Sequence, residues 1–189
     1  VAEILAHLQI DHITLIAALL HDVVEDTEYT KEDIEKLFGA EVAFLVDGVT
    51  KLNQFQYETK EDRQMENYRK MILAMAKDVR VVVIKLGDRL HNMRTLKHMR
   101  SDKQKRIAKE TLEIFAPLAY RLGIFNVKWE LEDLSFRYLE PDKYYDLVDQ
   151  MKQKRQARED IVNDTMEQLT KALGEAGIKA DIKGRPKHF

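Results

Sequence analysis

The sequence predicts an all-α protein, and three observations favour that fold class. Hydrophobic residues make up 44% and charged residues 34% of the 189 residues, and the two kinds are mixed along the whole length. This composition is typical of a helix-rich globular protein. Only 7 Gly and 3 Pro interrupt the pattern. The length suffices for one good hydrophobic core, or for one domain with the beginning of another.

The charge balance and the missing cysteines exclude several classes of partner and site. A net charge of -2, from 31 basic and 33 acidic residues, gives no overall field toward nucleic acid or an anionic membrane. Without cysteine there are no disulfides and no thiolate zinc sites, so a reducing cytoplasm is the expected location. No signal peptide and no membrane-spanning apolar run are present. The chain starts at Val1 within an apolar pattern, so we expect it to be cut from a longer protein.

Capping signals define the first helices. Asp11 is a suitable cap for a helix that runs to about Val24. Thr30 and Asp33 have the spacing of a capping box, and Gly39 suits the end of that helix. A short helix over 41–49, a loop over 50–62 and a helix from Thr59 through 77 follow.

The segment 79–95 begins with β-branched residues, which favour a strand, but its periodicity predicts a helix. At about 100° per residue one sector holds the apolar residues Val79, Val82, Val83, Leu86, Leu90 and Met93. The opposite sector holds Asp88, His91, Asn92 and Thr95. We therefore expect a helix with one apolar and one polar stripe.

The last third of the chain predicts two further helices and one very long one. The first covers 101–123, with a kink at Pro117 and an end at Gly123. A helix over 126–140 follows, and Pro141 then opens a helix to about Gly177. Residues 178–183 alternate as a short strand does. The predicted organisation is a helical domain over 1–140, a connecting helix over 141–177 and the start of another domain over 178–189.

The stretch "HDVVED" places four candidate ligands on the predicted first helix. His21, Asp22, Glu25 and Asp26 share a sector of roughly 140° at about 100° per residue. An amphipathic helix with a polar face explains this pattern without any site. However, carboxylates in the last turns of a helix are unfavourable by about 0.3–1 kcal/mol each, so three together favour a bound cation.

The polar stripe of the 79–95 helix offers a second half of such a site. Asp88, His91, Asn92 and Thr95 follow i, i+3, i+4, i+7 spacing. Such a stripe is often only the solvated side of a helix, but this one consists of ligand and hydrogen-bonding side chains. Imidazole with carboxylates suits Mn²⁺, Fe²⁺ or Zn²⁺. An ion there would acidify a bound water and neutralise phosphate oxygens.

These residues resemble a known family. "HDVVED" with "KLGDRLHNMRTL" resembles the HD-domain metal phosphohydrolases, and more closely the hydrolase domain of the RelA/SpoT homologues, which make and degrade (p)ppGpp. "LVDGVTKL", "ETLEIFAPLAYRLGI" and "KWELEDLSFRYL" are similar to the same family, so the resemblance covers essentially the whole chain. The terminal "GRPKHF" is similar to the entry of the synthetase domain.

The resemblance implies an HD-domain helical bundle with one Mn²⁺. His21, Asp22 and Asp88 match the metal ligands, and Glu25 with Asp26 match the catalytic acidic pair. The family's remaining histidine ligand belongs to a helix ahead of Val1. His7 and His12 are the only upstream histidines in this chain, and we interpret both as surface residues.

The reaction implied by the resemblance is hydrolysis of the 3′-pyrophosphate of (p)ppGpp to pyrophosphate and GDP or GTP. A metal-bound water would be the nucleophile, and Glu25 and Asp26 would orient or deprotonate it or serve the leaving group. Asn92 and Thr95 would contact the nucleotide. Lys51 and Arg89 would meet phosphate, although an ordinary surface cation is an equal interpretation for each. The implied partners are (p)ppGpp, the protein's own synthetase and C-terminal regulatory domains, and the ribosome through the full-length protein.

Two alternatives remain at the level of the sequence. The first is an HD phosphohydrolase of another nucleotide or phosphoester. The second is a non-catalytic regulatory HD module of a (p)ppGpp synthetase.

Overall fold

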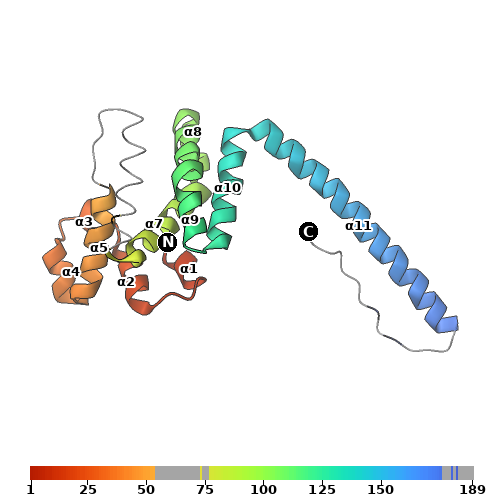
Figure 1. Ribbon diagram of the computed structural model, residues 1–189, viewed down its shortest axis with the longest axis horizontal. Coiled ribbons are helices and arrows are strands. Elements are labelled where there is room, and N and C mark those ends of the chain that lie inside the picture. The colour runs from red at the N-terminus through yellow and green to blue at the C-terminus, as the bar shows by residue number, and fades with distance from the viewer. Residues whose placement is uncertain (54–72, 74–76, 176–179, 181, 183–189) are drawn as a thin grey trace. The chain divides into compact units, whose positions relative to one another are not determined.

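Helices account for all the regular structure of the described residues, which confirms the all-α prediction for them. The computed structural model describes residues 1–53, 73, 77–175, 180 and 182. The chain divides into two units, Val1–Leu139 and Glu140–Phe189 (Figure 1). Most of the predicted strand over 178–183 and most of the predicted segment from 54 to 77 lie outside the described residues.

Among the described residues, the first unit contains all the short and medium helices. They are α1 (Ala2–Ala6), α2 (His12–Leu20), α3 (Val23–Asp26), α4 (Lys31–Phe38), α5 (Ala40–Asn53), α7 (Val79–Arg94), η1 (Leu96–His98), α8 (Ser101–Glu110), the π-helical turn η2 (Thr111–Phe115), α9 (Ala116–Arg121) and α10 (Phe125–Leu139). The second unit contains α11 (Pro141–Glu175), which starts at Pro141 as predicted. No helix among the described residues is both long enough and apolar enough to span a membrane.

Helix α7 belongs to both hydrophobic clusters of the first unit. Its N-terminal half supplies Val81 and Ile84 to a cluster with α1, α2, α4 and α5. Its C-terminal half supplies Leu86, Leu90 and Met93 to a cluster with α8, η2, α9 and α10. The predicted helix over 79–95 is therefore confirmed, and α7 is the element that the two hydrophobic clusters share.

Two glycines permit close approach to α7. A β-carbon on Gly48 of α5 would lie 2.8 Å from a methyl group of Val81, and one on Gly87 would lie 3.0 Å from a methyl group of Leu5. Larger residues at either position would push α5 or α1 away from α7. Gly87 therefore brings α1 directly against the turn of α7 that also carries Asp88.

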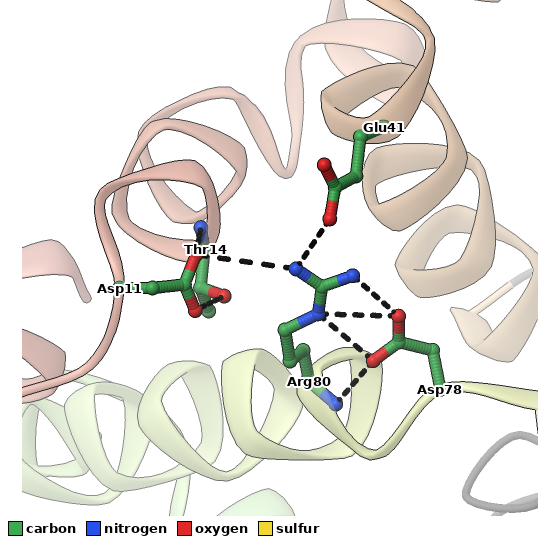
Figure 2. A network of polar contacts seen from close by, with 5 residues as sticks. All are labelled: Asp11, Thr14, Glu41, Asp78 and Arg80. Carbon is green, nitrogen blue, oxygen red and sulfur yellow. Dashed lines mark hydrogen bonds and ion pairs between the residues drawn. The ribbon is translucent and has the colours of Figure 1, made fainter.

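The N-terminal ends of α2, α5 and α7 are joined by Arg80 (Figure 2). Its guanidinium bonds Asp78 through Nε and Nη2, at 3.0 and 2.7 Å, and Glu41 through Nη1 at 2.7 Å. The same Nη1 lies 3.9 Å from Asp11, the N-cap of α2. Hydrogen bonds from Arg80 lower the pKa of Asp78. We call this group of four charged side chains the Arg80 junction.

The capping predictions at Asp11, Thr30 and Gly39 are confirmed, and the predicted helix start at Thr59 lies outside the described residues. Asp11 accepts from the Thr14 N–H at 3.0 Å. The Thr30 and Asp33 side chains form both bonds of a capping box, and Gly39 ends α4 with φ at 93°.

The predicted helix from Asp11 to Val24 is wrong at its end. Helix α2 stops at Leu20, and Asp22, with φ -100° and ψ -5°, separates it from α3. The His21 ring bonds the Ala18 carbonyl, which is the acceptor that the Asp22 N–H would use in a continuous helix. Side chains that compete for helix carbonyls in this way bend or end helices.

Two smaller boundaries also differ from prediction. Helix α5 continues to Asn53, into the predicted loop over 50–62. Before Pro117 the helical run over 101–121 widens into the π-helical turn η2. A wide turn there accommodates a proline, which has no N–H to offer the preceding turn.

Candidate functional site

The bend between α2 and α3 fixes the orientation of the His21 ring. Because a carbonyl oxygen can only accept, the His21 Nδ1 must carry a proton and donate it to Ala18 at 2.9 Å. In the neutral imidazole, Nε2 then carries the lone pair. A backbone carbonyl on one ring nitrogen is the usual partner of a histidine whose other nitrogen binds a metal ion.

The Nε2 lone pair faces two carboxylates. It lies 3.0 Å from Oδ2 of Asp22 and 3.9 Å from Oδ1 of Asp88. A lone pair and two anions repel one another unless a cation lies among them. Two ligands of one ion at about 2.1 Å are separated by about 3.0 Å at right angles and by about 4.2 Å when opposite. Both separations from Nε2 therefore suit donors to a shared ion, and we call His21, Asp22 and Asp88 the His21 cluster.

Asp88 is more enclosed than a residue of a solvated stripe. It is 8% exposed, although the periodicity placed it on the polar side of its helix. The difference arises because α1 packs on the neighbouring Gly87 and α2 ends beside it. Its Oδ1 accepts from the Asn92 amide at 2.9 Å, and its Oδ2 pairs with the Lys85 ammonium. Enclosure of a carboxylate with defined partners distinguishes a built site from a surface acid.

Lys85 is the residue of this site that the sequence analysis missed. It lies within the quoted "KLGDRLHNMRTL", and its side chain is 14% exposed. Its i, i+3 spacing to Asp88 was the available signal, since residues three apart are neighbours on a helix.

Glu25 and Asp26 lie on α3, one turn beyond the metal-ligand candidates. Their backbone N–H groups donate to the Asp22 carbonyl, at 3.1 and 2.9 Å. Both belong to the first turn of α3 and both side chains are exposed. The argument that these acids oppose the dipole of a continuous helix is therefore wrong, because the chain bends before them. An acid at the start of a helical turn is favourable.

The structure places the predicted substrate contacts as follows. Asn92 is held against Asp88 within the site. Thr95 caps α7, and its hydroxyl donates to the His91 and Asn92 carbonyls at 3.1 and 3.3 Å. Lys51, in the last turn of α5, is exposed and pairs with Asp47 at 2.7 Å. Of these three residues, Asn92 is the one that donates a hydrogen bond to the His21 cluster within the described part of the chain.

Arg89 is largely enclosed and contacts both a carboxylate and an aromatic ring. Its side chain is 14% exposed, pairs with Glu110 at 3.3 Å and lies 4.0 Å over the Phe115 ring. Burial lowers the pKa of its guanidinium. These contacts conflict with the interpretation of Arg89 as an ordinary surface cation, and its contact with phosphate stays a prediction.

The donor set suits a metal ion without being a finished cage. Within the described part of the chain, no group of three or more His, Cys, Asp or Glu side chains is already arranged to hold a metal. Lys85 and Asn92 hold the Asp88 carboxylate, so the two aspartates would have to close around an ion. His7 and His12 are both exposed. His7 bonds the Glu3 carbonyl at 2.8 Å.

Comparison with known proteins gives consistent results over the whole chain. Residues 1–125 match the family described as "HD domain". The chain is 52% identical over 189 residues to a "Guanosine-3′,5′-bis(diphosphate) 3′-pyrophosphohydrolase" of Haemophilus influenzae, covering 100% of this chain and 28% of that protein. It is 50% identical to the "Bifunctional (p)ppGpp synthase/hydrolase SpoT" of Escherichia coli K12, covering 27% of it. It is also 51% identical to a "GTP pyrophosphokinase" of Myxococcus xanthus, covering 25% of it.

The chain thus spans about a quarter of the length of these curated relatives, and all of it takes part in each match. The match to the family covers α1 through α9, which include the His21 cluster and the acids of α3. The all-α fold and the similarity agree, and the chain belongs to the HD-domain family.

Proposed function

We propose that this chain is the hydrolase domain of a bifunctional RelA/SpoT-type enzyme of the stringent response. In this proposal it removes the 3′-pyrophosphate of (p)ppGpp and releases pyrophosphate with GDP or GTP. The observation that carries the proposal is the His21 cluster, in which the ring Nε2 faces two carboxylates. Support for the substrate comes from the relatives that are named for this reaction and match every part of the chain.

His21, Asp22 and Asp88 are the residues that would hold the ion, which we propose to be Mn²⁺. Mixed nitrogen and oxygen ligands favour Mn²⁺, Fe²⁺ or Zn²⁺ over Mg²⁺. When bound, such an ion supplies charge that acidifies water and neutralises phosphate oxygens. The Ala18 carbonyl and the Asn92 amide orient the histidine and the distant aspartate for this task.

The acids of α3 would handle the protons of the reaction. Water adds to the phosphorus attached to the ribose 3′-oxygen, the bond from that phosphorus to the 3′-oxygen breaks, and the 3′-oxygen leaves with a proton. One proton must therefore be taken from the water and one must reach the leaving oxygen. Glu25 and Asp26 are exposed one turn beyond Asp22. Their carboxylates can accept a proton from the water and deliver one to the leaving oxygen. Asn92 and Thr95, on the last turn of α7, are the proposed nucleotide contacts, and Lys51 is a proposed phosphate contact.

Direct product analysis tests the proposal. The full-length gene product that contains these residues is incubated with ppGpp and Mn²⁺, and nucleotide and pyrophosphate are quantified. We expect equal amounts of GDP and pyrophosphate, no reaction in chelator, and no comparable turnover of GTP, GDP or ATP. Equal turnover across a nucleotide panel would instead favour a general HD phosphohydrolase.

A second function is supported by one specific observation. Some relatives that match the same residues are named only for GTP pyrophosphokinase activity. In that alternative the domain regulates an adjoining synthetase and hydrolyses nothing. Mn²⁺-dependent loss of ppGpp rejects it, whereas a change in synthesis rate upon mutation of Asp88, without any hydrolysis, supports it.

A further inference from the structure

Lys85 is the one enclosed cation in direct contact with the His21 cluster among the described residues. Its ammonium pairs with Oδ2 of Asp88, and the two side chains are 14% and 11% exposed. The other oxygen of Asp88 faces His21 and accepts from Asn92. The carboxylate is thus divided between a resident cation on one side and the metal-ligand candidates on the other.

A metal site without its ion leaves enclosed carboxylates without a counter-charge, and the Lys85 ammonium supplies one. A buried carboxylate without a partner is costly, and removal of its cation leaves that cost uncompensated. Asp22 is half exposed and water can reach it, but Asp88 is enclosed. Lys85 supplies the missing charge from the same helix, three residues away, so no loop or partner has to move.

The same ammonium must oppose the ion that the site binds. A divalent ion at the His21 cluster and the Lys85 ammonium would share one carboxylate, and like charges at that separation repel strongly in an enclosed place. We propose that Lys85 is a positioning residue that serves as the counter-cation of Asp88 in the metal-free protein and weakens metal affinity. The site therefore remains folded when empty, and its occupancy follows the free concentration of the ion.

This inference rests on the proposed metal site, and its test reads metal binding instead of turnover. Hydrogen exchange of the α7 backbone amides is measured in the full-length gene product, in chelator and along a Mn²⁺ titration. Lys85→Met removes the charge at similar length, and Lys85→Arg keeps it. Lys128→Met is the matched control, because Lys128 is also little exposed and pairs with Glu132 at 2.7 Å, four residues along α10.

In chelator, Lys85→Met should exchange about 10- to 100-fold faster than wild type, since a buried carboxylate loses its partner. In saturating Mn²⁺ that difference should shrink by about tenfold, because the ion then supplies the charge. The half-saturating Mn²⁺ concentration should fall by about tenfold, as expected when a neighbouring like charge is removed. Lys85→Arg should resemble wild type in all three measurements. If Lys85→Met does not fold in chelator, Lys85→Gln, which still donates to Asp88, replaces it.

Two results separate failure of this inference from failure of the proposed site. In one result, exchange in wild type responds to Mn²⁺, but Lys85→Met loses the same amount of protection with and without the ion. Lys85 is then only structural. Lys128→Met should behave in this way, with a smaller loss of protection. Unchanged or weaker Mn²⁺ affinity in Lys85→Met likewise overturns the inference. If wild-type protection ignores Mn²⁺, the metal site itself is wrong and the inference falls with it.

Discussion

Helices α2 and α7 are joined by charged side chains at two places, and the two junctions differ in what completes them. Near the start of both helices, Arg80 supplies one guanidinium to Asp78, Glu41 and Asp11 (Figure 2). Near the end of α2, the His21 ring presents a lone pair to Asp22 and Asp88. The chain itself completes the first junction, whereas at the second a ring nitrogen faces two carboxylate oxygens.

The difference shows how charged contacts can be sorted into structural and functional ones. At the Arg80 junction each donor points at an acceptor, so nothing more is required for stability. At the His21 cluster a ring nitrogen faces two carboxylates, an arrangement that becomes favourable when a positive charge, either a proton on Nε2 or a bound cation, lies between them. Burial alone does not separate the two, since Asp78 at 17% and Asp88 at 11% side-chain exposure are both enclosed.

The largest expected effect is a loss of hydrolysis when the two acids that follow the His21 cluster are replaced. Glu25→Gln combined with Asp26→Asn should lower ppGpp hydrolysis by about 10²–10⁴-fold, because groups that transfer protons contribute that much. Mn²⁺ binding should persist, since His21, Asp22 and Asp88 are intact. Pyrophosphate release in single-turnover assays measures the effect.

The matched control comes from the other junction. Glu41→Gln removes an acid that is 52% exposed and paired with Arg80, and hydrolysis should continue at the wild-type rate. Near-normal turnover in a folded variant with both Glu25 and Asp26 replaced would show that these acids have no role in hydrolysis.

Loss of the Arg80 guanidinium should affect stability alone. Arg80→Met leaves three carboxylates without their shared cation, and we expect a loss of about 2 kcal/mol, since charged hydrogen bonds contribute about 1.5–3 kcal/mol before screening by solvent. Urea unfolding followed by a probe in the first unit measures it. The loss should be equal with and without Mn²⁺.

Arg94→Met serves as the exposed counterpart. Arg94 bonds Glu130 at 2.6 Å but both are largely solvated, so the cost should stay below about 1 kcal/mol. Substantial recovery of Arg80→Met by Mn²⁺ would contradict the separation between the junctions.

The smallest predicted effect is the acid sensitivity of the Arg80 junction. Hydrogen bonds from Arg80 hold the pKa of Asp78 below 3.8 in the folded protein, so the unfolded chain takes up a proton first. The contribution of Asp78 is therefore complete above the unfolded value and is lost as pH falls through the lower folded value. Between pH 5 and pH 2.5, Asp78→Asn should show a shallower decline in unfolding free energy than wild type, by less than about 1 kcal/mol.

An equal decline in both proteins would assign the acid sensitivity to other carboxylates. Asp11 is the next candidate, because a hydrogen bond from the Thr14 hydroxyl lowers its pKa.

Periodicity and capping predicted the helices well because each depends on nearby residues. The capping box at Thr30 and Asp33, the start of α11 at Pro141 and the helical state of 79–94 all follow from local rules. The break at His21 did not, since it depends on a ring that takes the Ala18 carbonyl. No pattern of hydrophobic residues contains that information.

The candidate site divides in the same way. Spacing and resemblance selected His21, Asp22 and Asp88, and the fold brings both aspartates within 4 Å of the histidine. The enclosure of Asp88 and the burial of Arg89 could not be predicted, because both depend on helices distant in sequence. Charged residues on a helix face carry no sign of which neighbour will cover them.

The His21 cluster should accept a divalent cation, and the Arg80 junction should not. Hydrogen exchange of α2 and α7 amides in the full-length gene product, with and without Mn²⁺, tests this difference most directly. At a hundredfold excess over the dissociation constant, bound ion adds about 2.7 kcal/mol, or about 100-fold slower exchange through global opening. Wild type and Glu41→Gln should show this slowing, and Asp22→Asn should lose it. Exchange that ignores Mn²⁺ in wild type, or equal slowing in Asp22→Asn, would contradict the account.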